Sequence, residues 1–278
     1  MLFIGMILTN VVPLPAVAWW AGRRQLARTA LSPTGLAGVF FLGFITCFAV
    51  IFRKLWEGYF VMRGVGLGGN LLLLVDNAFW EELGKLAALL VALVLARRAA
   101  AKAGRAPAAT ADDSSRLARL PALTLGYWVG LGYGSGEAIL LSLAFLHPGV
   151  FQYTGLHTFG AFLVPLFIYD RFWAIQLHAV MGVIIALGIS WPRERLATSP
   201  AREPSAGRDR GRLVALFALA MLFHVLVDGT VVLAQTFPGM VRYYPPDLAY
   251  TPALVVFGYI YMWLTFRWTG PAKGVRLK

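Results

Sequence analysis

Seven apolar runs, each long enough to cross a lipid bilayer, dominate the sequence. A helix of about 20 apolar residues spans the hydrocarbon core. Hydrophobic residues make up 59% of the 278 positions and charged residues only 14%, which is typical of a polytopic membrane protein. The sequence therefore predicts an all-α membrane helix bundle of about seven transmembrane helices, forming a single membrane domain over residues 1–278. The runs are 2–20, 35–52, 71–95, 120–145, 171–191, 213–236 and 252–268.

The formal net charge of +12 comes mostly from cations in the connections between these runs. Such cations are topology signals and contacts for the anionic lipids of the bilayer, so they do not predict a nucleic-acid partner. They gather in the first, third and fifth connections and in the carboxy-terminal tail. The positive-inside rule then predicts an outside amino terminus and a cytoplasmic carboxy terminus. We expect the membrane to be a bacterial or archaeal cell membrane. The inside connections 97–119 and 192–212 are rich in Ala, Pro, Ser and Arg, and we expect them to be mobile linkers.

Ionisable residues interrupt four of the apolar runs at a similar depth. A charge near the bilayer centre costs about 2.5–3.5 kcal/mol on insertion scales, so such residues indicate a function. With a rise of about 1.5 Å per residue, five of them, Glu81, Glu137, His178, His224 and Asp228, fall roughly 11–18 Å from the outer ends of their helices. We therefore expect them to form one site within the core region 71–236. The residues are Glu81, Glu82 and Lys85 in the third run, Glu137 in the fourth, His178 in the fifth, and His224 and Asp228 in the sixth.

Spacing and residue type suggest a role for each member of this set. Residues four apart share a helix face, as Lys85 does with Glu81 and Asp228 does with His224. Lys85 would keep Glu81 ionised or help to neutralise an oxyanion. Glu82, about 100° round the helix from Glu81, would support a neighbouring helix or a backbone group.

Two histidines with nearby carboxylates suit a zinc-type site that leaves one position open for water. The histidines would supply nitrogen ligands, and Glu137 or Asp228 could supply an oxygen ligand. Glu81 would then take the proton from the attacking water.

The fourth run contains a glycine-rich segment, residues 130–137, that no strand precedes. It predicts close helix packing rather than a nucleotide-binding loop. Its glycines form two faces at four-residue spacing, Gly130 with Gly134 and Gly132 with Gly136.

The order of these residues resembles the YhfC-like intramembrane metalloproteases, which are relatives of the PrsW-like and CAAX-processing (prenyl) protease superfamily. The resemblance covers about residues 76–234. It implies a membrane-embedded, metal-dependent endopeptidase that cleaves a membrane protein or peptide, with Glu81 as the water activator. The prenyl-protease branch has an arginine one residue after the position of Lys85, and an aromatic residue where this chain has Ala174. Both differences argue against a CAAX substrate and leave the substrate class open. The matching segments are Glu81-Glu82-Leu83-Gly84-Lys85, the glycine-rich segment ending in Glu137, Arg171 followed by His178, and His224 followed by Asp228.

Two other functions are compatible with the same residues. Chains of intramembrane Glu, His, Asp and Lys also move ions or protons in transporters. A non-catalytic membrane scaffold could have kept a polar core. The sequence does not predict the oligomeric state.

Overall fold

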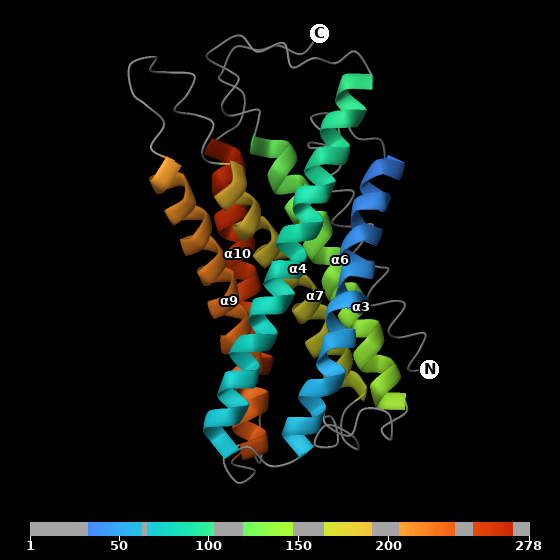
Figure 1. Cartoon of the computed structure of the whole chain (residues 1–278), viewed down its shortest axis with the longest axis vertical. Coiled ribbons are helices and arrows are strands. Elements are labelled where there is room, and N and C mark those ends of the chain that lie inside the picture. Colours follow the sequence, from blue (N-terminus) through green and yellow to red (C-terminus); the bar gives the residue numbers. More distant parts are fainter. Residues whose placement is uncertain are drawn as a thin grey trace.

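The computed structural model describes six helices, and the described part of the chain is entirely helical (Figure 1). Each of the last six predicted runs lies within one of these helices, to within a residue, and the helices extend beyond the runs by up to ten residues. The first predicted run, 2–20, lies outside the described residues, so the total of about seven spans stays a prediction. The helices are α3 (Pro33–Met62), α4 (Gly66–Lys102), α6 (Arg119–Leu146), α7 (Val164–Ser190), α9 (Ala206–Thr236) and α10 (Asp247–Trp268).

Three of the six helices are long and apolar enough to cross a membrane, which indicates a membrane protein. These spans are Thr34–Phe52 in α3, Arg171–Ile189 in α7 and Arg210–Gly229 in α9. On α4, the charged residues at 81, 82 and 85 interrupt an otherwise apolar sequence.

The helices run side by side as one bundle, with α7 at its centre (Figure 1). Helix α7 packs against α4, α6, α9 and α10, and almost all of its apolar span is buried within the protein. The outward faces of α3, α4, α9 and α10 carry large exposed apolar side chains, which a bilayer would cover. The ionisable side chain of His178 on α7 is therefore surrounded by protein rather than by lipid.

The prediction of mobile linkers at 97–119 and 192–212 is wrong at one end of each segment. Helix α4 continues to Lys102 and α9 begins at Ala206, so residues 97–102 and 206–212 are helical. On α4 the reason is that Ala, Arg and Lys are strong helix formers, so the helix continues after its apolar stretch ends. The rest of both segments, up to Arg119 and Ala206, lies outside the described residues.

The glycines of α6 confirm the predicted close packing, because they hold α6 between two helices. A Cβ atom placed on Gly130 would lie 2.1 Å from the carbonyl oxygen of His178 on α7. A Cβ atom on Gly132 would lie 2.0 Å from the carbonyl oxygen of Phe40 on α3. Both distances are far below van der Waals contact, so only glycine permits these helix approaches. The Gly130 face thus brings α6 directly against the backbone of His178.

Candidate metal centre

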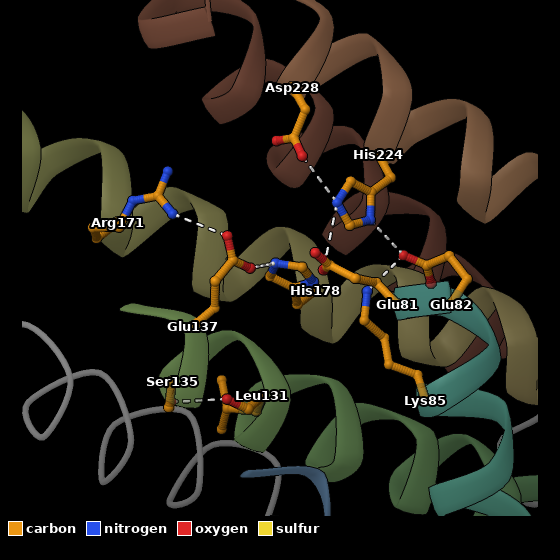
Figure 2. A network of polar contacts seen from close by, with 10 residues as sticks. All are labelled: Glu81, Glu82, Lys85, Leu131, Ser135, Glu137, Arg171, His178, His224 and Asp228. Carbon is orange, nitrogen blue, oxygen red and sulfur yellow. Dashed lines mark hydrogen bonds and ion pairs between the residues drawn. The ribbon is translucent and has the colours of Figure 1, made fainter. Parts of the chain in front are cut away.

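The ionisable residues of α4, α6, α7 and α9 converge in one polar network inside the bundle (Figure 2). All seven residues predicted from the sequence belong to it, together with Arg171. The glutamates and lysine of α4 and both histidines are at most 5% exposed. The side chain of Asp228 is the most accessible member, at 36%. The network is therefore a buried site with one partly open side.

The imidazole of His224 is held at one nitrogen by Glu82. Nδ1 of His224 lies 2.8 Å from Glu82 Oε1, and Lys85 Nζ lies 2.6 Å from the same oxygen. The expectation that Lys85 would pair with Glu81 is corrected here, because its buried ion pair is with Glu82. Residues three apart share a helix face as well as residues four apart, so spacing alone could not choose between the two glutamates.

The imidazole of His178 is held in the same way by Glu137. Nε2 of His178 lies 2.5 Å from Glu137 Oε2, and Arg171 Nη1 lies 3.3 Å from Glu137 Oε1. Arg171 was not predicted as a site residue. It stands seven positions before His178, about two helical turns, so their shared face on α7 could have revealed it.

Each histidine therefore has one nitrogen left for a ligand. Nε2 of His224 lies 3.5 Å from Glu81 Oε2 and 3.2 Å from Asp228 Oδ2. Nδ1 of His178 is buried and has no hydrogen-bond partner among the described residues. The ring centroids lie 5.5 Å apart with the planes at 79°, and Figure 2 shows the Glu81 carboxylate between the two rings.

Glu81, His178 and His224 form a group that could hold a metal ion. Each offers one ligand atom, and these atoms all lie within 4.8 Å of one another. Two imidazole nitrogens and one carboxylate oxygen are a donor set of zinc sites that keep a fourth position for water. In such sites a carboxylate or carbonyl commonly orients each histidine through its other nitrogen, which is the arrangement that Glu82 and Glu137 provide.

The charges of the network also fit a divalent cation. Four carboxylates, those of Glu81, Glu82, Glu137 and Asp228, face the two cations Lys85 and Arg171. With neutral histidines, two negative charges remain, and a buried excess charge is costly unless something compensates it.

The carboxylate that lies near both histidines is that of Glu81, which the sequence predicted as the base rather than as a ligand. The sequence suggested Glu137 or Asp228 as the oxygen ligand and Glu81 as a base beside the metal. In the structure Glu81 belongs to the candidate ligand group, whereas Glu137 and Asp228 contact the histidines. Equal depth in the membrane could not separate these residues, because it does not determine which way a side chain points.

Tyr133 on α6 completes the inner wall of the site and was not predicted. Its ring centroid lies 4.9 Å from Lys85 Nζ and 5.5 Å from the His178 ring. It stands four residues before Glu137, so the helix face that it shares with Glu137 was the available signal.

None of the protein-family models, curated proteins or solved structures compared with the chain matches it. The resemblance to YhfC-like metalloproteases accordingly stays a prediction from the residues.

Proposed function

We propose that this protein is an intramembrane endopeptidase that hydrolyses a peptide bond of a membrane protein or peptide, with zinc held by His178 and His224 and with Glu81, the third member of their group, as the base that activates water. The proposal extends the resemblance to YhfC-like metalloproteases. One observation carries it: a buried carboxylate lies between two histidines, and each histidine is oriented by its own carboxylate and cation.

The chemistry that this arrangement suits is the activation of water. When bound, zinc would lower the pKa of a water ligand and polarise the scissile carbonyl. Glu81 then takes a proton as the water oxygen bonds to the carbonyl carbon, and it returns that proton to the amine nitrogen when the C–N bond breaks. Glu82 and Glu137 keep the two imidazole rings in position through both steps.

The more accessible residues of the network indicate where a substrate would approach. Asp228, Arg171 and Glu137 are partly exposed, whereas Glu81, Glu82 and Lys85 on α4 are fully buried. Asp228 follows His224 by one turn toward the carboxy-terminal end of α9. That end is extracytoplasmic under the positive-inside rule, so we propose cleavage at an extracytoplasmic juxtamembrane bond.

The test uses the purified full-length protein in lipid vesicles, with fluorescently labelled casein as the probe. We expect Glu81→Gln to lower the cleavage rate by about 10²–10⁴-fold, because the amide cannot accept the proton. We expect His178→Ala and His224→Ala to abolish cleavage together with the bound zinc. A chelator should inhibit the wild-type protein, and added zinc should restore its activity.

Ser135→Ala is the matched control, since the buried Ser135 hydroxyl donates only to the carbonyl of Leu131 in its own helix (Figure 2). Wild-type rates in all three site variants would overturn the proposal. Proton flux across the vesicles without proteolysis, lost in the same variants, would favour the transporter instead.

A further inference from the structure

Tyr133 carries a buried hydroxyl group whose presence packing does not explain. The side chain is fully buried, and its hydroxyl has no hydrogen-bond partner among the described residues. A buried polar group without a partner costs about 1–3 kcal/mol. Phenylalanine would fill the same space without that cost, so a bound ligand is the natural partner of this hydroxyl.

The Tyr133 ring lies beside the candidate metal group. Lys85 and His178 contact the ring from α4 and α7. Ring carbon Cε2, two bonds from the hydroxyl oxygen, lies 3.8 Å from the position that a Cβ atom on Gly84 would occupy. Gly84 stands about one helical turn after Glu81, so the hydroxyl end of the ring meets α4 one turn beyond the proposed water activator.

Lys85 is poorly placed for the oxyanion role that the sequence suggested. Its ammonium group is paired with Glu82 at 2.6 Å and lies over the face of the Tyr133 ring. Turning it toward a substrate would leave the buried Glu82 carboxylate without its cation, which is costly. A hydrogen bond to an oxyanion, in addition to the polarisation that zinc would supply, would therefore come from a side chain other than Lys85.

We propose that the Tyr133 hydroxyl donates a hydrogen bond to the substrate carbonyl oxygen as negative charge develops on it. This inference rests on the proposed hydrolytic function and assigns the site its oxyanion donor. No bond to Tyr133 forms or breaks. A neutral phenol in a buried site is a strong donor that needs no reorganisation during the reaction.

Tyr133→Phe tests the inference, because it removes the hydroxyl and keeps the ring. With labelled casein as the probe, we expect kcat to fall by about 10²–10³-fold, as for the loss of one oxyanion donor, while KM changes little. Zinc content should stay at the wild-type level and the midpoint of thermal unfolding should not fall, since no hydrogen bond within the protein is lost.

Tyr127→Phe is the matched control on the same helix. The Tyr127 hydroxyl bonds the Tyr259 hydroxyl at 3.0 Å, and Tyr259 donates to Gln176 Oε1, so this network ties α10 to α6 and α7. We expect this variant to unfold about 2–4 °C lower, with an unchanged cleavage rate. A Tyr133→Phe variant that keeps the wild-type kcat, or that loses activity together with zinc or thermal stability, would overturn the inference.

A binding measurement separates this inference from the proposed function. Acetohydroxamate places its oxygens on a zinc ion without any peptide hydrolysis, so its dissociation constant can be measured with the zinc-loaded protein. If the dissociation constant rises about tenfold or more in Tyr133→Phe, the Tyr133 hydroxyl donates a hydrogen bond to an oxygen of the bound ligand. This result would support the inference even if the wild-type protein cleaves no peptide. Equal dissociation constants would exclude that role.

Discussion

At the scale of single residues, the two histidines are held by the same kind of partner set. Lys85 and Glu82 hold His224 at Nδ1, and Arg171 and Glu137 hold His178 at Nε2. In both sets a cation compensates a carboxylate that orients an imidazole. A buried charge without a partner would destabilise the folded protein. The orientation of each histidine therefore depends on its carboxylate, and that carboxylate depends on its cation.

Glu82→Ala should therefore weaken zinc binding without removing a ligand. We expect the zinc dissociation constant to rise about 10–100-fold, because His224 loses the contact that fixes its ring. Competition with a chelating dye measures this constant. An unchanged constant in Glu82→Ala would contradict the orienting role, and Ser135→Ala supplies the baseline.

We expect Lys85→Met to destabilise the folded protein, and not only to lower its cleavage rate. Removing the cation leaves the buried Glu82 carboxylate unpaired, and breaking a buried pair costs about 3–5 kcal/mol. The double variant Lys85→Met, Glu82→Gln should recover much of this loss, because the charge is then absent from both positions. Unfolding in detergent measures the free energies, and a double variant no more stable than Lys85→Met would contradict the pairing.

At the scale of elements, the spacing between α6 and its neighbours positions the site. Gly130 and Gly134 bring α6 against α7 at His178, and Gly132 and Gly136 bring it against α3. Glu137 follows directly on the same helix, so its carboxylate reaches His178 only while this spacing is kept. Helix packing thus sets the distances between residues that are far apart in sequence.

Gly130→Ala should disturb this spacing, because its Cβ atom would collide with the backbone of His178. We expect a loss of about 1–3 kcal/mol in stability and weaker zinc binding. Gly38→Ala is the matched control, since nothing lies within 4 Å of a Cβ atom there. Equal zinc affinity in the two variants would show that α6 can shift without moving the site.

At the scale of the whole molecule, the bundle is organised from the centre outward. Helix α7 is enclosed by its neighbours, and the apolar side chains of the outer helices face away from the bundle. The cations Arg97, Arg98 and Lys102 extend α4 beyond its apolar part. Their position predicts that this end of α4 is cytoplasmic.

Labelling with a membrane-impermeant maleimide tests this orientation. In a Cys47→Ala background, Gly68→Cys at the start of α4 should react in intact cells, because Gly68 is exposed and open space surrounds it. Lys102→Cys, at the exposed other end, should react only after the cells are permeabilised. The reverse pattern would place the site toward the cytoplasm and contradict cleavage at the outer face.

The sequence by itself determined the six described helices, their apolar character and seven members of the site. Run length, charge placement and depth along a helix are properties of consecutive residues, so Glu81, His178 and His224 could be grouped before any fold was known. Only the tertiary structure decided which side chains contact each other. It pairs Lys85 with Glu82, and it brings Arg171 and Tyr133 into the site. Those choices depend on side-chain direction and on helix approaches of a few ångströms, which arise only when separate helices pack together.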